Sequence, residues 1–309
     1  MGFEKIVLVT RKTRLEGLIE RFNTRQQAQF YIEHSGGNFK LFEQEHETYY
    51  AALGRLRDGL GKLLKVQVVE RGYLPNFLFA ESDLVVTLGI DGQVVNTAKY
   101  LDGQPLVAVN PDPAHIDGVL LPYDVKSAAK AVEKVLGGQY QFRAISMALA
   151  RLNDGQQLLA FNDLFVGLSD HRSARYRIRL GEREERHSSS GVIVSTGAGA
   201  TGWLSSMFNM ANGMLTYFSD EGLRLSPPTL DWETEQLVFV VREPFASKTS
   251  GAEIVTGVVT REQPLIIESE MAESGLIFSD GVAADFLAFN AGSVATISLA
   301  GKKTRLVVG

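Results

Sequence analysis

A short loop in the first half of the sequence carries residues that could bind a phosphate and move a proton. Gly89, Asp91 and Gly92 lie within the run LGIDGQ (88–93), after an apolar stretch and before a helical pattern. Glycines let backbone N–H groups approach a phosphate, and a helix N-terminus adds favourable partial charge. Asp91 could accept a proton from a substrate hydroxyl or position a metal ion. Alternatively, it only caps the helix that follows.

A second glycine-rich loop, VIVSTGAGATGW (192–203), lies between a β-branched run and a helical pattern. Its glycines match the dinucleotide fingerprint G-x-G-x-x-G, but no strand ending in an acidic residue follows about 20 positions later, as that fingerprint requires. Hydroxyl groups flank the glycines, and Trp203 offers a stacking surface or, alternatively, an ordinary core aromatic. The residues in question are Gly197, Gly199 and Gly202 with Ser195, Thr196 and Thr201. The loop therefore suits phosphates without the context of a Rossmann motif.

Asn162 and Asp163 form a third candidate site, at the junction of two strand-like runs. An adjacent amide and carboxylate can bind both hydroxyls of a ribose, because the carboxylate accepts hydrogen bonds while the amide donates and accepts. The alternative is an ordinary turn pair without a ligand.

The first half alternates short apolar runs with helical patterns, which predicts a doubly wound α/β domain with a mostly parallel sheet. The predicted strands are Lys5–Thr10, Lys65–Glu70, Leu84–Leu88 and Leu106–Val109. The predicted helices are Arg14–Ile32 (broken near Thr24), Glu43–Leu60, Val94–Leu101 and Lys126–Leu136. Ligands of such sheets bind beyond the carboxyl ends of the strands, where Gly89 and Asp91 lie.

From about Tyr140 the pattern changes to strand-like runs separated by turns. An Asn-Asp-Gly turn at 153–155 predicts a hairpin, and one helical stretch, Thr201–Leu215, interrupts the strands. The other predicted strands are Tyr176–Leu180, Val192–Ser195, Leu237–Arg242, Leu265–Glu268, Leu276–Ser279 and Val294–Leu299. We therefore predict an α/β nucleotide-binding domain over residues 1–142 and a β-rich domain over residues 143–309.

Composition argues against several classes of protein. A net charge of −5 disfavours nucleic-acid and membrane-surface binding, which need a basic excess. The chain has no cysteine, enters its first strand almost at once and lacks an apolar run of about 20 residues, so we expect a cytoplasmic protein without a leader or membrane span. Its histidines are scattered, which gives no metal-hydrolase pattern, and no G-x-S-x-G sequence marks a serine hydrolase.

Taken in order, the three sites resemble the motifs of the NAD kinase family. The run 89–93 is similar to the family's Gly-Gly-Asp-Gly-Thr, Asn162-Asp163 to its Asn-Glu pair, and 195–203 to its Ser-Thr-x-x-Gly-x-Thr-x-aromatic loop. The stretches VTRKTR (9–14), VNPDP (109–113) and VREP (241–244) look like the branch typified by the mitochondrial NAD kinases of animals, and SDG (279–281) resembles the family's late Asp-Gly turn. The resemblance covers nearly the whole chain.

This resemblance implies a two-domain kinase with its active site between the domains and its dinucleotide pocket contributed by the β-rich domain. It would move a phosphoryl group from ATP, or in some members polyphosphate, onto the 2′-hydroxyl of the adenosine ribose of NAD. Asp91 would be the general base, and magnesium would arrive with the nucleotide phosphates rather than in a protein metal site. The family also implies a homo-oligomer whose ligands are small-molecule nucleotides. Phosphate or nucleotide contacts would come from Gly89, Gly92, Gln93, Ser195, Thr196 and Gly199. The dinucleotide would contact Asn110, Asn162, Asp163, Thr201, Gly202, Trp203 and Ser206.

The phosphate loop departs from the family pattern at two positions. Ile90 places a β-branched side chain where the family has glycine, and Gln93 replaces a threonine hydroxyl. Asp163 is also one methylene shorter than the usual glutamate. Alternatives to an active NAD kinase are therefore a weak or inactive NAD(P)-binding relative, and a kinase of the same fold acting on a sugar or other hydroxyl compound. An NAD-dependent oxidoreductase is a further alternative.

Overall fold

The computed structural model describes residues 2–219 and 222–309, which form two compact units. The first unit runs to Arg143 and also includes Thr304–Gly309, while the second comprises Ala144–Lys303. Two strands, β6 (Gln141–Leu152) and β17 (Val294–Val308), begin in one unit and end in the other. The end of the predicted second domain thus belongs to the first unit, because β17 continues past the predicted Leu299 and pairs with β4.

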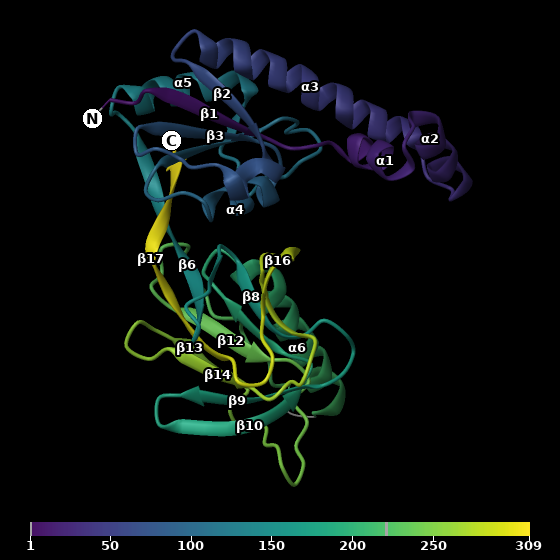
Figure 1. Cartoon of the computed structure of the whole chain (residues 1–309), viewed down its shortest axis with the longest axis vertical. Coiled ribbons are helices and arrows are strands. Elements are labelled where there is room, and N and C mark those ends of the chain that lie inside the picture. The colour runs from purple at the N-terminus through teal and green to yellow at the C-terminus, as the bar shows by residue number, and fades with distance from the viewer. Residues whose placement is uncertain (1, 220–221) are drawn as a thin grey trace. The chain divides into compact units, whose positions relative to one another are not determined.

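A parallel sheet with strand order β2-β1-β3-β4 forms the centre of the first unit (Figure 1). Its strands are β1 (Lys5–Thr10), β2 (Val66–Glu70), β3 (Asp83–Leu88) and β4 (Pro105–Asn110), and the short β5 (Tyr123–Asp124) pairs with β4. Strands β3 and β4 are buried at every position, as expected for apolar strands of a sheet covered on both faces.

Helices cover both faces of this sheet. Figure 1 shows α3 and α5 on one face and α4 on the other. The helices are α1 (Arg14–Phe22), α2 (Arg25–His34), α3 (Phe39–Gly61), the 3-10 helix η1 (Arg71–Asn76), α4 (Asp91–Ala98) and α5 (Val125–Leu136). The predicted break near Thr24 is confirmed, because the Thr24 side chain caps α2 by accepting a hydrogen bond from Gln27 N.

The chain leaves β1 and β3 toward opposite faces of the sheet. The segment after β1 leads to α3, whereas the segment after β3 leads to α4. The two strands are direct neighbours, since Val9 pairs with Thr87. In open α/β sheets, this point of reversed connection is where ligands bind, at the carboxyl ends of the strands. Arg11 and Gly89, which follow these strands, therefore lie at the favoured ligand position of the unit.

The second unit consists of two antiparallel layers that share one apolar core, which includes Tyr176, Ile178 and Phe239. One layer has strand order β13-β12-β11-β8-β15-β16, and the other contains β10, β9 and β14 next to β17, with the hairpin β6–β7. The strands are β7 (Gln157–Ala160), β8 (Asp163–Leu168), β9 (Ala174–Leu180), β10 (Arg183–Ser189), β11 (Val192–Ser195), β12 (Leu237–Val241), β13 (Thr256–Val259), β14 (Leu265–Ser269), β15 (Gly275–Ser279) and β16 (Val282–Ala288). The helical stretch is the π-helical turn η2 (Ala200–Leu204) followed by α6 (Ser205–Phe218).

The predicted fold class, an α/β domain followed by a β-rich domain, is confirmed by this architecture. Strands β5, β10, β13 and β16 were not predicted from the sequence. None of the helices in residues 2–219 and 222–309 combines the length and apolar character needed to cross a membrane.

Candidate functional site

Asp91 is the first residue of α4, which begins earlier than the predicted Val94. Its carboxylate accepts two backbone hydrogen bonds from the loop after β4: Oδ1 from Leu120 N at 2.9 Å and Oδ2 from Val119 N at 3.1 Å. The N-cap position of α4 is occupied by Ile90, and no side chain makes a capping hydrogen bond there. The interpretation of Asp91 as the cap of this helix is therefore wrong. Each carboxylate oxygen can accept more than one hydrogen bond, which leaves Asp91 able to accept another from a substrate hydroxyl.

The two residues that depart from the family pattern occupy different environments. Ile90 has an extended backbone (φ −96°, ψ 172°), which does not require glycine, and its side chain is 43% exposed. Gln93 is fully buried, and its Nε2 donates a hydrogen bond to Thr10 O at 3.1 Å. A Cβ added to Gly89 would lie 3.0 Å from the Cβ of Gln93, whereas one added to Gly92 would meet nothing within 4 Å. Gln93 therefore ties α4 to the end of β1 and faces the protein interior rather than a ligand.

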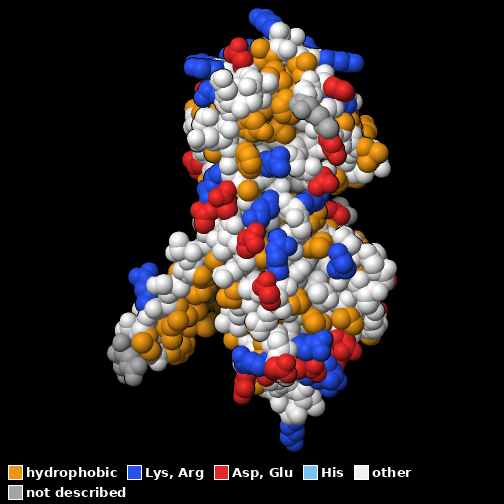
Figure 2. All heavy atoms as spheres, turned by 90° about the vertical axis from the view of Figure 1, so that its left-hand side faces the viewer, with side chains coloured by type: hydrophobic (Ala, Val, Ile, Leu, Met, Phe, Trp, Pro, Cys, Tyr) orange, Lys and Arg blue, Asp and Glu red, His pale blue; other side chains and the backbone are white. Residues whose placement is uncertain are grey.

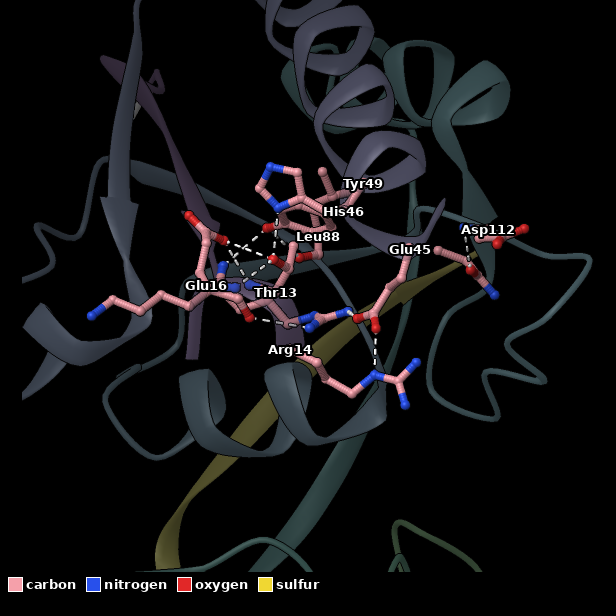
Figure 3. A network of polar contacts seen from close by, with 11 residues as sticks. Thr13, Arg14, Glu16, Glu45, His46, Tyr49, Leu88 and Asp112 are labelled. Atoms are coloured by element: carbon pink, nitrogen blue, oxygen red, sulfur yellow. Dashed lines mark hydrogen bonds and ion pairs between the residues drawn. The ribbon is translucent and has the colours of Figure 1, made fainter. Parts of the chain in front are cut away.

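A polar network at the ends of β1 and β3 contains residues that the sequence analysis did not assign (Figure 3). Arg11 N donates to Tyr49 Oη at 2.9 Å, and its Nη2 donates to Glu45 Oε1 at 3.0 Å. Arg14 also donates to Glu45. Burial alone would raise the pKa of Glu45, but the hydrogen bonds from Arg14 and Arg11 hold it below its ordinary value.

The side chain of Arg11 lies next to Gly89 in the phosphate-loop motif. Its Cδ would lie 3.5 Å from a Cβ on Gly89, and its buried Nε has no hydrogen-bond partner among the described residues. The signal that could have identified Arg11 is its position directly after β1, because β1 and β3 end at the same edge of the sheet.

Asn110, a predicted dinucleotide contact, is buried at the end of β4. Its Nδ2 donates to Ile116 O at 2.8 Å, and its Oδ1 accepts from Asp112 N at 2.9 Å. These bonds shape the loop that presents the amides of Val119 and Leu120 to Asp91. Asn110 thus supports the position of Asp91 through the backbone.

In the second unit, the two remaining motifs lie together at one edge of a sheet. Asp163 at the start of β8 pairs with Ser195 at the end of β11, and Leu164 pairs with Ser279 at the end of β15. The Asp280 carboxylate accepts hydrogen bonds from the backbone N–H groups of three successive residues, Phe161 (3.1 Å), Asn162 (2.7 Å) and Asp163 (3.3 Å). Asp280 therefore fixes the Asn-Asp segment, a role that the sequence analysis did not assign.

The hydroxyls of the glycine-rich loop are used inside the protein. Ser195 and Thr196 are buried, and Thr196 Oγ1 donates to Phe161 O at 2.6 Å. Thr196 N donates to Asn162 O at 2.9 Å. A Cβ on Gly199 would overlap the carbonyl oxygen of Asn162, and one on Gly197 would overlap that of Asp231. These two glycines thus allow close approach of the chain to itself, which a ligand fingerprint does not predict. The predicted ligand residues Thr201, Gly202 and Ser206 are exposed.

Trp203 belongs to a stack of aromatic rings on the second unit. It lies parallel to Phe165 at 5.7 Å between ring centroids, and Phe278 lies 5.0 Å from Phe165. The Cζ atom of Arg242 is 5.6 Å from the Trp203 centroid. Sequence reasoning identified Trp203 but missed the two phenylalanines, because only the register of β8 against β15 makes them neighbours.

Burial raises the pKa of Asp163 to about 7, with a hydrogen bond from Ser195 opposing the effect and the charge of Asp280 adding to it. Its Oδ1 atom is buried and has no hydrogen-bond partner among the described residues. The carboxyl group is therefore partly protonated at neutral pH and can donate as well as accept a hydrogen bond.

Between pH 5 and pH 8, we expect the wild type to lose a few kcal/mol more folding stability than Asp163→Asn. The folded protein holds the Asp163 proton more tightly than the unfolded chain does. The contribution of this proton to folding stability is therefore complete below about pH 4 and is lost as the pH rises through about 7. Thermal unfolding at the two pH values measures the difference. The exposed Asp170→Asn is the matched control and should follow the wild type, whereas an identical pH dependence for Asp163→Asn would refute the prediction.

Comparison with known proteins identifies similar chains. No protein-family model matches the sequence. An NAD kinase of Heliobacterium modesticaldum is 34% identical over 129 residues, which are 39% of this chain and 44% of that protein. An NAD kinase of Thiobacillus denitrificans is 30% identical over 205 residues, 61% of this chain and 68% of that protein. The chain spans about half the length of the first curated relatives that it matches.

Two solved structures share the fold at low sequence identity. Yeast NADH kinase complexed with NADH aligns with a TM-score of 0.60 and 13% identity, covering 100% of this chain and 84% of that one. An NAD kinase from Archaeoglobus fulgidus in complex with ATP gives a TM-score of 0.59 and 16% identity, covering 97% and 92% of the two chains.

Proposed function

This chain belongs to the NAD kinase family, and we propose that it transfers a phosphoryl group from ATP or polyphosphate to the 2′-hydroxyl of NAD, giving NADP. The observation that carries the proposal is the position of Asp91. Its carboxylate stands at the carboxyl end of β3, held by two backbone amides at 2.9 and 3.1 Å. There it accepts the proton of the ribose hydroxyl while that oxygen forms a bond to the terminal phosphorus and the bond to the leaving phosphate breaks.

We propose that Arg11 assists the phosphoryl donor in the first unit. The Cδ atom of its side chain lies beside Gly89, and its guanidinium group is paired with Glu45. A phosphate group that takes the place of Glu45 on the Arg11 guanidinium would gain a charge-assisted hydrogen bond. No group of three His, Asp or Glu residues suited to a metal ion occurs within the described residues. We propose that magnesium comes bound to the nucleotide phosphates and neutralises part of their charge.

We propose that the dinucleotide ribose binds in the second unit to Asn162 and Asp163. The backbone of this pair is fixed by Asp280, which leaves the side chains preorganised for the two ribose hydroxyls. Thr201 and Ser206 are both exposed and close to Trp203 in the sequence, and their hydroxyl groups would give the dinucleotide further polar contacts.

Incubating the protein with NAD, magnesium and either ATP or polyphosphate tests the function directly. We expect NADP to form with at least one donor, and a parallel reaction with NADH shows which dinucleotide is preferred. A chain that binds NAD but yields no NADP at high enzyme concentration is a catalytically inactive relative. Donor consumption only with a sugar or another hydroxyl compound would assign the chemistry to a different acceptor.

Replacing Ile90 by glycine is expected to lower the KM for the phosphoryl donor about tenfold. The exposed isoleucine side chain stands beside the first amides of α4, and its removal lets a phosphate reach their N–H groups. Steady-state kinetics with varied ATP measure the change. Ile90→Val, which keeps the β-branch, should behave like the wild type, and an equal gain in that variant would contradict the explanation.

A further inference from the structure

One peptide group at the end of β1 is held by side chains from helices on opposite faces of the sheet. Its carbonyl, Thr10 O, accepts a hydrogen bond from Gln93 Nε2 on α4 at 3.1 Å. Its amide, Arg11 N, donates to Tyr49 Oη on α3 at 2.9 Å. Gln93 is fully buried and Tyr49 is 2% exposed, so water competes little for either hydrogen bond. The peptide group between Thr10 and Arg11 is therefore fixed in one orientation.

The same tyrosine also ties this peptide group to the end of β3. Its hydroxyl donates to Leu88 O at 3.4 Å, directly before Gly89 (Figure 3). A Cβ added to Gly89 would lie 3.0 Å from Gln93 Cβ and 3.5 Å from Arg11 Cδ, so the backbone of Gly89 packs against both side chains. The ends of β1 and β3 and the start of α4 are thus joined around the phosphate-loop motif.

The fixed peptide group sets the direction of the Arg11 side chain, because that side chain leaves the backbone next to it. The guanidinium lies over the Tyr49 ring, with 5.1 Å between Cζ and the ring centroid, and donates a hydrogen bond to Glu45. The chain has a net charge of −5, and Lys and Arg side chains are interspersed with Asp and Glu on the face drawn in Figure 2. Attraction of a phosphate chain therefore depends on the position of single arginines, and not on a broad positive surface.

We propose that Gln93 and Tyr49 are positioning residues for the phosphoryl donor and act through Arg11. This inference rests on the proposed function, in which Arg11 assists the donor. Gln93 stands where the family pattern has threonine, and its amide replaces a phosphate contact by a contact that fixes the arginine. A threonine hydroxyl lies two bonds closer to the backbone than Gln93 Nε2 and would not reach Thr10 O. Returning position 93 to threonine therefore weakens phosphate binding instead of restoring it.

Isothermal titration calorimetry with magnesium tripolyphosphate, in the absence of NAD, tests this proposal without turnover. Tripolyphosphate carries the phosphate chain that ATP and polyphosphate share. For Gln93→Thr and for Tyr49→Phe, we expect the dissociation constant to rise about tenfold, which corresponds to the loss of about one charge-assisted hydrogen bond. In an Arg11→Gln background, the same two changes should alter it by less than about twofold, because the group through which they act is gone.

Gln104→Thr is the matched control for the loss of a buried amide. Gln104 is a buried glutamine directly before β4, and its Nε2 donates to a backbone carbonyl, Ala80 O, also at 3.1 Å. Thermal unfolding should show a similar loss of stability in Gln104→Thr and Gln93→Thr. Only Gln93→Thr should lose affinity for tripolyphosphate.

Wild-type affinity in Gln93→Thr, or an equal loss of affinity in Gln104→Thr, would overturn the proposal. Additive effects of Gln93→Thr and Arg11→Gln would also overturn it, as would a wild type that does not bind tripolyphosphate. A wild type that shows the expected non-additivity but forms no NADP would support the positioning role and refute the proposed function. NADP formation together with unchanged affinity in Gln93→Thr would refute the positioning role alone.

Discussion

Replacing Asp91 by asparagine is expected to lower the kcat of NADP formation by about 10²–10⁴-fold. Asparagine keeps the size of the side chain but cannot take the proton of the ribose hydroxyl. A spectrophotometric assay of NADP at saturating NAD and donor measures this loss. Asp117→Asn is the matched control, since Asp117 is an exposed carboxylate of the same loop that supplies the amides of Val119 and Leu120.

The structural role of Asp91 must be separated from its chemical role. In Asp91→Asn, one of the two backbone amides loses its acceptor, which costs about 1–3 kcal/mol of folding stability. Thermal unfolding and NAD binding should therefore show a folded, binding-competent protein whose turnover is selectively lost. A variant that retains more than about one tenth of wild-type kcat would rule out Asp91 as the general base.

Gly199→Ala is expected to destabilise the second unit by about 3 kcal/mol and to abolish most NAD binding. The added Cβ would overlap the carbonyl oxygen of Asn162, which is backbone and cannot rotate away. The loop could relieve the overlap only by giving up the hydrogen bond from Thr196 N to Asn162 O. That movement would also displace the Asn162–Asp163 segment, which Asp280 otherwise holds.

Denaturant unfolding and calorimetric titration with NAD measure the two effects of Gly199→Ala. Gly54→Ala is the control for adding a methyl group, because its Cβ lies in α3 with no atom within 4 Å. That control should raise stability by up to about 1 kcal/mol. Unchanged stability and NAD affinity in Gly199→Ala would show that the loop yields easily and that its glycine has no packing function.

Helix α6 shows a limit of prediction from sequence pattern. The sequence pattern predicts a helix over 201–215, and methionines such as Met210 in such a helix are normally interpreted as ordinary packing. In the structure, α6 has no buried residue, and Met210 and Met214 are exposed. Hydrophobic periodicity indicates which face of a helix is apolar. It does not say whether that face packs against the same chain.

Much of the fold follows from local pattern alone. Apolar β-branched runs such as Val192–Ser195 predict strands, and the threonine at position 24 predicts a helix boundary, because these preferences arise within a few residues of chain. Strand β10 (REERHSS) was not predicted because all of its residues are charged or polar. It is stabilised by pairing with β9.

The sequence by itself determined the family and the fold class, and the order of the motifs singled out Asp91, Asn162 and Asp163 as candidate site residues. Tertiary structure decided what surrounds them: Gln93 and Thr196 are turned inward, Arg11 stands beside Gly89, and Asp280 holds the Asn162–Asp163 backbone. Strand register and burial join residues more than a hundred positions apart, and no local periodicity carries that information. The raised pKa of Asp163 has the same origin, because desolvation depends on everything packed around the carboxyl group.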